Sequence, residues 1–429
     1  MATRTIRVDA LTRVEGEGAL ELDIEGDRIE SVRLAIFEPP RLFEALLRGR
    51  DCTEAPDITA RICGICPVAY QMSSVRAMEA ALGIRVDGQL QALRRLLYCG
   101  EWIESHALHV VLLHAPDFLG FPDAISMAQT HGEMVRRGLA AKKVGNDLLR
   151  LLGGREIHPV NVRVGGFYRA PAKAELESLV PALREAREGA AALARWVATF
   201  PFPDFERDYI FVAMANAPDY PLEAGRIVSS EGLDIEAAEY EDHFAERHVA
   251  HSTALQSVLD GKDSYLVGPL ARFNLNYPAL GASVHALCAE LGLAPVCRNP
   301  YRSIIIRAVE TVYACEEALR LIAAYVPPSA PSITFTRRAG VGMACTEAPR
   351  GMLWHRYRLA EDGSILEAKI VPPTSQNQGT IEQDVLAVAT RDLALAEDVL
   401  RDRCEQAIRN YDPCISCSTH FLRLEVRRR

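Results

Sequence analysis

The chain lacks any long run of apolar residues. Nowhere in its 429 residues does an uncharged apolar stretch reach about 18 residues, the length that a helix needs to cross a bilayer. The first residues, M-A-T-R-T-I-R-V, contain no continuous apolar segment. We therefore expect no secretory signal peptide, and the sequence predicts a cytoplasmic chain without a membrane span.

An excess of basic residues is also absent. Lys and Arg number 48 against 57 Asp and Glu, which gives a formal net charge of −9. Proteins that bind nucleic-acid phosphates or lie on anionic membranes usually carry the opposite balance, so we expect no nucleic-acid partner. Nucleotide-binding loops are missing as well, because no G-x-G-x-x-G follows a strand-like segment and no G-x-x-x-x-G-K occurs.

The composition is that of a soluble globular protein with a large core. Apolar residues make up 49% and charged residues 24% of the chain. There is no internal repeat, low-complexity tract or linker, so we predict a single α+β domain with an N-terminal β-hairpin region on a large helix-rich body. Its expected parts are a β-rich segment, a helical core, a mixed insertion, a part that closes the functional site and a tail: 1–50, 51–200, 201–300, 301–420 and 421–429.

Hydrophobic periodicity places the main elements. Two alternating runs joined by a Gly-Asp turn predict a hairpin over 19–37. Apolar residues three and four apart predict long helices between about 67 and 200. The other expected elements are helices over 235–258, 308–326 and 381–410, and strands near 331–336 and 364–371.

Cysteine is abundant, with eleven residues. An odd number in a reducing compartment disfavours disulfides and favours metal ligands or buried thiols. Four of the cysteines form two C-x-x-C pairs, Cys63 with Cys66 and Cys414 with Cys417. The other seven are isolated among apolar neighbours and are predicted to be small buried side chains: Cys52, Cys99, Cys288, Cys297, Cys315, Cys345 and Cys404.

Each cysteine pair is predicted to lie at the N-terminus of a helix. Pro67 suits the first helical position after Cys66, and Asp412-Pro413 suits an N-cap followed by that position. Helix N-termini favour thiolate over thiol. Four thiolates from the two ends of the chain can bind a soft metal, whether a structural zinc or a catalytic metal. The long separation of the pairs disfavours the zinc.

The residues around these pairs resemble the large, catalytic subunit of nickel–iron hydrogenases over nearly the whole chain. The stretch R-I-C-G-I-C-P-V-A-Y-Q-M is most similar to the cytoplasmic, bidirectional branch linked to NAD or NADP, which includes the sulfhydrogenases. The resemblance implies reversible cleavage of dihydrogen into protons and electrons. The matching elements are Arg13-Val-Glu15-Gly16, Arg61-x-Cys63-Gly64-x-Cys66, Ser105-His106-x-x-His109, Gly153-Gly154-Arg155-x-x-His158-Pro159, Glu347-Ala-Pro349-Arg350-Gly351 and Asp412-Pro413-Cys414-x-x-Cys417-x-x-His420.

The resemblance also implies the metal ligands. Both members of each pair, Cys63, Cys66, Cys414 and Cys417, would bind nickel. The second member of each pair would also bridge to an iron that carries CO and cyanide. Glu44, 19 residues before Cys63, would bind a magnesium ion together with His420, water and a carbonyl near Lys369. A solvated helix face is the alternative for Glu44.

Three groups would carry protons and charge. The resemblance implies that Cys414 takes the first proton and that Glu15 passes it outward. Arg350 would place a fixed cation at the site, paired with Asp412 and Asp117. By local sequence alone, Glu15 and Arg350 would be surface residues, and Asp412 an N-cap. The histidines of the matching elements are interpreted as hydrogen-bonded core or proton-network residues: His106, His109 and His158.

Electrons must leave through other subunits, because the chain has too few additional clustered cysteines for iron–sulfur clusters. The resemblance implies an iron–sulfur small subunit and a flavin-containing diaphorase pair. It also implies an endopeptidase that cuts after His420 and removes 421–429; a permanent tail packed on the body is the alternative. Two rival functions remain, a quinone-module subunit and a zinc-stabilised scaffold.

Overall fold

The computed structural model describes residues 3–36, 43–261 and 263–418. An antiparallel N-terminal sheet is formed by β1 (Thr3–Val8), β2 (Gly18–Glu25) and β3 (Arg28–Ile36), in that order. Leu20, Leu22 and Ile24 are all buried, so the alternating run presents one face to the core. The hairpin prediction is confirmed, and β1 adds a third strand within the segment predicted to be β-rich.

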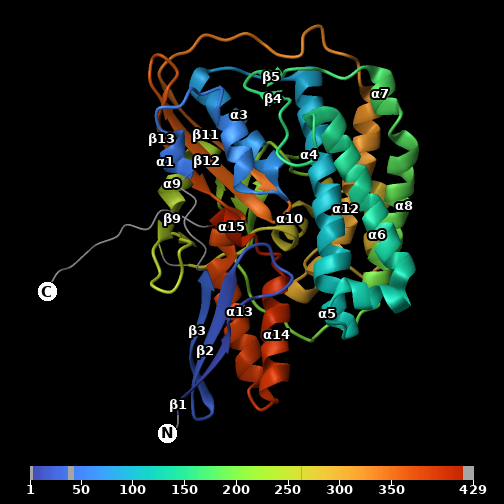
Figure 1. Cartoon of the computed structure of the whole chain (residues 1–429), viewed down its shortest axis with the longest axis vertical. Helices are drawn as coiled ribbons and strands as arrows, with labels where there is room; N and C mark the ends of the chain where they lie inside the picture. The colour runs from blue at the N-terminus through green and yellow to red at the C-terminus, as the bar shows by residue number, and fades with distance from the viewer. Residues whose placement is uncertain (1–2, 37–42, 262, 419–429) are drawn as a thin grey trace, which may run out of the picture.

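Long helices stand side by side at one side of the molecule (Figure 1). The spacing of their apolar residues follows the helical repeat, as the sequence predicts. Helices α4 and α6 pack so closely that a Cβ on Gly145 would lie 2.6 Å from the carbonyl oxygen of Gly100. The helical elements of this part are α1 (Phe43–Leu47), α2 (Ala55–Thr59), η1 (Ala60–Ile62), α3 (Pro67–Leu82), α4 (Gly88–Leu108), the π-helical turn η2 (His109–His114), α5 (Ala115–Leu119), α6 (Ala124–Gly153), α7 (Lys173–Glu177) and α8 (Val180–Ala198).

The predicted helix over 235–258 is wrong. The segment instead contains two short helical elements, η3 (Ala237–Glu239) and α9 (Tyr240–His243), followed by a hairpin of β9 (Phe244–Arg247) and β10 (Gln256–Leu259). Tyr240 and Phe244 have helical spacing, but they stack on each other with ring centroids 4.5 Å apart, and Tyr240 also stacks on Trp354. This aromatic packing overrides the local pattern. The other elements of the region are β4 (Val162–Arg163), β5 (Gly166–Phe167), β6 (Val212–Ala215), β7 (Arg226–Ser229), β8 (Asp234–Ile235), α10 (Pro269–Asn276), η4 (Tyr277–Ala279) and α11 (Ala282–Glu290).

The C-terminal part adds a second three-stranded antiparallel sheet, in the order β11-β12-β13. The strand predicted at 364–371 is confirmed by β13, and the helix at 308–326 lies almost entirely in α12. The segment 331–336 forms only an isolated bridge from Ser332 to Gly166, and the single helix predicted over 381–410 is two helices. The elements are η5 (Pro300–Arg302), α12 (Ser303–Ala324), β11 (Gly340–Ala348), β12 (Gly351–Leu359), β13 (Ile365–Val371), α13 (Pro373–Asp392), α14 (Glu397–Arg409) and α15 (Ile415–Ser418).

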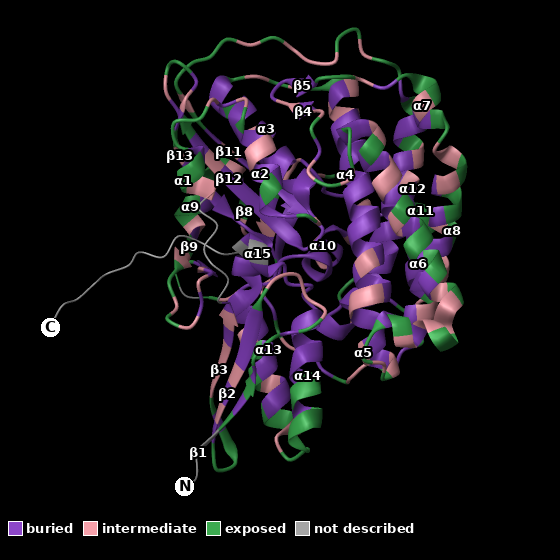
Figure 2. Cartoon of the chain, viewed as in Figure 1, coloured by how far each residue is buried: buried purple, intermediate pink, exposed green. Residues whose placement is uncertain are grey.

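The segment around Glu15 and the last described helix meet at the centre of the fold. Helix α15 lies between the N-terminal sheet and α3 (Figure 1), and a parallel bridge joins Glu15 to Cys414. Helix α4 and the sheet β11-β12-β13 are largely buried, whereas exposed residues gather on α6 and α8 (Figure 2). Over the ranges described above, no helix has both the length and the apolar character required to span a membrane.

Candidate metal centre

Four buried cysteine sulfurs converge at the centre of the molecule. The Sγ atoms of Cys63 and Cys414 are 3.4 Å apart, those of Cys414 and Cys417 are 3.0 Å apart, and those of Cys66 and Cys417 are 3.9 Å apart. All four sulfurs lie within 4.8 Å of one another. The structure therefore brings together the two pairs as the sequence predicts. All eleven cysteines are buried and unpaired by disulfides.

The first pair lies at a helix N-terminus, as predicted. Cys66 is the N-cap of α3 and Pro67 is its first residue. The backbone N–H groups of Ile65 and Cys66 both donate to Cys63 Sγ over 3.3 Å. These donors stabilise a thiolate at Cys63.

The N-cap prediction for Asp412 is wrong. Helix α15 begins at Ile415, and Asp412 lies before it in a left-handed conformation with φ of 53°. Its carboxylate accepts a hydrogen bond from Arg350 instead of from helical N–H groups. The strained backbone of Asp412 is thus held by an ion pair, an arrangement that is common at functional sites.

The electrostatics of the four thiols favour a bound cation. Burial raises the pKa of the Cys414 and Cys417 thiols, whereas hydrogen bonds from Cys414 and Cys417 lower the pKa of Cys63. Four adjacent thiolates cannot all be charged in a buried site without a neutralising cation. The all-sulfur donor set therefore fits a soft transition metal.

Glu15 contacts the same cysteine cluster. The Cys414 thiol donates to Glu15 Oε2 over 3.1 Å, and the Ile415 N–H donates to the Glu15 carbonyl over 2.9 Å. The backbone and the side chain of Glu15 are thus both fixed against the second cysteine pair. This is the position that a proton acceptor for Cys414 requires.

Arg350 lies at a buried hairpin turn beside the centre. Ala348 pairs with Gly351, so Pro349 and Arg350 form the two-residue turn between β11 and β12. Arg350 Nε donates to the Asp412 carbonyl over 2.7 Å and Nη2 donates to Asp412 Oδ1 over 3.0 Å. Burial opposes its charge, but Asp412 and the cysteine thiolates raise the pKa of Arg350 above its usual range.

Two further buried arginines support this turn, and the sequence analysis missed both. Arg272, which is fully buried, donates to the carbonyls of Ala348 and Pro349 over 2.8 and 3.0 Å. Its remaining bonds go to the carboxylates of Glu347 and Glu310. The Pro349 carbonyl also accepts from Arg307 Nη1 over 3.4 Å, so the two arginines together fix the backbone that carries Arg350.

The second of these arginines is Arg307, on α12. Its Nη1 lies 3.6 Å from Asp412 Oδ2, and burial lowers the pKa of Arg307 to about 10. The sequence signal is an arginine and a glutamate three residues apart, Arg307 and Glu310, inside the otherwise apolar run S-I-I-I-R-A-V-E. Such residues must face polar partners once the helix is buried.

The predicted pairing of Asp117 with Arg350 is wrong. Asp117 lies on α5 and forms ion pairs with Arg13 and Arg409. The position of α5 after the π-helical turn η2 directs this carboxylate toward the N-terminal segment instead of the hairpin turn. Asp412 alone of the two predicted aspartates pairs with Arg350.

Glu44 is placed near the predicted carbonyl ligand. Glu44 Oε1 accepts a hydrogen bond from the Ile370 N–H over 2.8 Å. Both Glu44 and Lys369 line a surface cavity of about 290 Å³. The other predicted ligand, His420, lies outside the described residues, so the magnesium site stays a prediction.

Of the three motif histidines, His109 and His158 make hydrogen bonds as predicted, whereas His106 is a core residue whose pKa burial lowers to about 4. His106 Nε2 lies 3.0 Å from the Glu310 carboxylate. His109 Nε2 lies 3.0 Å from the Arg409 carbonyl, and His158 Nδ1 lies 2.6 Å from the Ala60 carbonyl. His109 and His158 thus tie the helical body to the segments that precede the two cysteine pairs.

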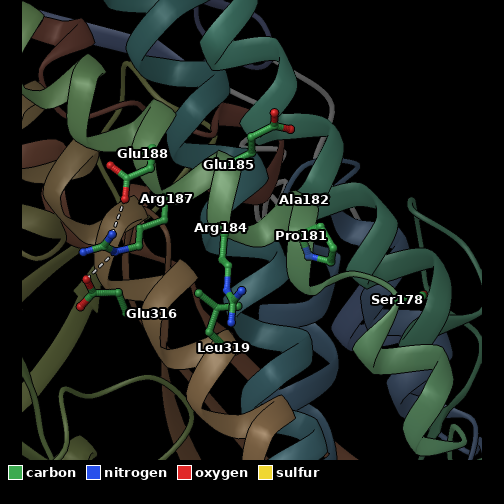
Figure 3. A pocket seen from close by; sticks show the side chains of 9 residues that line it. All are labelled: Ser178, Pro181, Ala182, Arg184, Glu185, Arg187, Glu188, Glu316 and Leu319. Carbon is green, nitrogen blue, oxygen red and sulfur yellow. Dashed lines mark hydrogen bonds and ion pairs between the residues drawn. The ribbon is translucent and has the colours of Figure 1, made fainter.

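A further cavity lies elsewhere on the surface. Its volume is about 1000 Å³, and it opens between α8 and α12 at the surface. Figure 3 shows that Arg187 bridges Glu188 and Glu316 in its wall. No cysteine or histidine is among the residues that line it.

Comparisons with known proteins agree with this centre. The family model described as nickel-dependent hydrogenase matches residues 41–147 and 261–420. Sulfhydrogenase 2 subunit alpha of Pyrococcus furiosus is 36% identical over 422 residues, which covers 98% of this chain and 100% of the relative. Sulfhydrogenase 1 subunit alpha of the same organism is 33% identical and covers 98% of each chain.

More distant relatives extend the comparison to structures. The NAD-reducing hydrogenase HoxS subunit beta of Cupriavidus necator is 25% identical and covers 98% of this chain and 95% of the relative. The crystal structure of an NAD+-reducing NiFe hydrogenase in the H2-reduced state superposes with a TM-score of 0.88 at 26% identity. That comparison covers 98% of this chain and all of the solved one. The resemblance derived from the motifs is confirmed.

The first prediction concerns the sulfur ligands. Replacing Cys417 by Ala should abolish nickel retention, because the sulfur of this residue lies between those of Cys414 and Cys66 and would serve two metals. Cys404→Ala is the matched control, since Cys404 is equally buried but isolated; it should keep its nickel and lose at most about 1 kcal/mol of stability. The measurement is the nickel content of the purified variants. A nickel content in Cys417→Ala equal to that of the wild-type protein would contradict the four-cysteine centre.

Proposed function

The chain belongs to the nickel-dependent hydrogenase family as a large subunit, and from this premise we propose that it reversibly cleaves dihydrogen into protons and electrons at a nickel–iron centre. The observation that carries the proposal is the convergence of four buried thiols from pairs 351 residues apart. When bound, the nickel–iron group supplies the heterolytic cleavage of dihydrogen. All four cysteines would hold nickel, Cys66 and Cys417 would also hold the iron, and we propose that this iron carries CO and cyanide.

The residues of the chain handle the proton. Cys414 Sγ accepts the proton that is released when dihydrogen is cleaved. Glu15 Oε2, 3.1 Å away, then accepts this proton from Cys414 in one transfer. Arg350, held by Asp412, provides a fixed positive charge beside the site. Because these groups are positioned by backbone contacts and buried ion pairs, little reorganisation accompanies the transfer.

A magnesium ion bound by Glu44 and His420 is part of the proposal. The support is that Glu44 lies beside the chain at Lys369 and Ile370. Hard cations of this kind prefer carboxylate, carbonyl and water ligands. The ion would tie the C-terminal segment to α1.

The electron acceptor is proposed to be NAD or NADP, reached through partner subunits. One of the relatives is named as an NAD-reducing hydrogenase. The chain itself has no nucleotide-binding loop, so the nucleotide would bind to a partner subunit. We propose an iron–sulfur small subunit, a flavin-containing diaphorase pair and a cytoplasmic location. A quinone-module subunit is disfavoured because all four cysteines are present, and a zinc scaffold would not need the buried arginines around them.

The second prediction tests this function. The nickel-loaded complex, purified through a tag on this chain, should carry iron–sulfur and flavin subunits and should oxidise dihydrogen with NAD or NADP as acceptor. The measurement is hydrogen-dependent reduction of NAD, NADP, deazaflavin and ferredoxin in parallel assays. Reduction of ferredoxin or deazaflavin alone would contradict the proposed acceptor, and a nickel-loaded complex without dihydrogen oxidation would contradict the function.

The third prediction concerns Glu15. Glu15→Gln keeps the volume of the side chain but cannot accept a proton, so hydrogen/deuterium exchange with solvent should fall by about 10²–10⁴-fold while nickel stays bound. Glu17→Gln is the matched control, because Glu17 lies in the same segment but is exposed. The measurement is the exchange rate per bound nickel. Wild-type exchange in Glu15→Gln would assign proton transfer to another group.

The fourth prediction concerns the C-terminus. We propose that an endopeptidase cuts after His420 once nickel is bound, because the three terminal arginines of 421–429 are unfavourable to bury beside a metal centre. Active, nickel-loaded enzyme should therefore end at His420, whereas nickel-free protein should keep the tail. Intact mass of both forms decides this. Active enzyme that carries all 429 residues would overturn it.

A further inference from the structure

A buried ion cluster lies next to the segment that carries Glu15. Asp117 on α5 is paired with two arginines, Arg13 from the N-terminal segment and Arg409 from α14. Arg409 holds it with two bonds, from Nε over 2.7 Å and from Nη2 over 3.0 Å. The side chains of Asp117 and Arg409 are only 6% and 4% exposed. A paired geometry of this kind, largely removed from solvent, is rigid.

The two arginines also bind backbone on both sides. Arg13 Nη1 donates to the carbonyl of Leu113, in the π-helical turn η2, over 3.0 Å. Arg409 Nη1 donates to the carbonyl of Thr12 over 3.0 Å and to Glu405 Oε2 over 2.9 Å. The Thr12–Arg13 segment is therefore clamped between η2 and α5 on one side and α14 on the other.

The clamped segment has an unfavourable backbone conformation. Arg13 has φ of 58°, in the left-handed region that is unfavourable for a non-glycine residue. Gly16, three residues later, has φ of 90° and permits the next turn. Without the clamp, Arg13 would relax toward the ordinary region and the chain at Glu15 would shift with it.

We propose that Asp117 is a positioning residue that, through Arg13 and Arg409, holds the Glu15 carboxylate at the Cys414 thiol. Glu15 lies two residues beyond Arg13 and is fixed at its far side by the Ile415 N–H. Its carboxylate reaches Cys414 only with the backbone in this place. The inference rests on the proposed proton-transfer role of Glu15.

The cluster differs from the other buried ion pairs of the helical body. Arg94 and Glu79, for example, form a two-bond pair of similar burial. That pair joins α4 to the C-terminal part of α3, 13 residues from Cys66 and therefore about 20 Å along the helix. It stabilises the body without fixing a strained segment at the centre, so it provides a matched control.

A double-mutant cycle tests the proposal. Asp117→Asn keeps the size of the side chain but removes its charge, and it should lower hydrogen/deuterium exchange per bound nickel by about 10²-fold through misplacement of Glu15. In the Glu15→Gln background the same change should cause no further loss. Glu79→Gln should leave exchange per nickel at the wild-type value even if its melting temperature falls.

Each outcome separates the positioning role from the proton role. If Glu15→Gln loses exchange and Asp117→Asn keeps it, the positioning role is overturned while the role of Glu15 stands. The positioning role is also overturned if Asp117→Asn lowers the exchange rate equally in the wild-type and Glu15→Gln backgrounds. A similar loss of exchange in Glu79→Gln has the same consequence. If Glu15→Gln exchanges hydrogen at the wild-type rate, both the positioning role of Asp117 and the proton-transfer role of Glu15 are overturned. If Asp117→Asn does not fold, Arg13→Lys, which keeps the charge but lacks the fork, must show the same loss and the same dependence on Glu15.

Discussion

Four sulfur atoms in one buried site are the constraint on which the rest of the structure depends. Thiolates at this spacing repel one another and are desolvated, so they require a metal cation and further positive groups around them. The ligands come from both ends of the chain. For this reason the N-terminal segment, α3, the β11–β12 turn and the segment before α15 must all meet at one point, and one continuous core surrounds them.

The positive groups are arranged in layers of ion pairs. Arg350 faces the centre and is held by Asp412, whose other carboxylate oxygen faces Arg307. Arg272 holds the turn itself. Burying so many charges is unfavourable unless each is paired and hydrogen-bonded; here the pairs fix segments whose backbone is strained, at Arg13 and Asp412. Stability and site geometry are thus supplied by the same contacts.

The sequence predicts the centre better than its surroundings. The cysteine pairs, the Pro67 helix start and the alternating hairpin are local patterns with direct physical causes. Asp117 could not be placed, because its partners Arg13 and Arg409 are 104 and 292 residues away and depend on the final packing. The helix expected over 235–258 failed for a related reason, since stacking of Tyr240 on Trp354 decides the conformation and helical spacing does not. The predicted magnesium ligand His420 lies outside the described residues.

The central claim is that these four thiols hold nickel beside iron. Nickel K-edge X-ray absorption on the purified wild-type complex tests it most directly, because the spectrum reports both the ligand atoms and any nearby metal. The account predicts nickel with a sulfur-dominated ligand shell and an iron neighbour. Nickel bound only by nitrogen and oxygen, or zinc as the metal of the sulfur site, would contradict it.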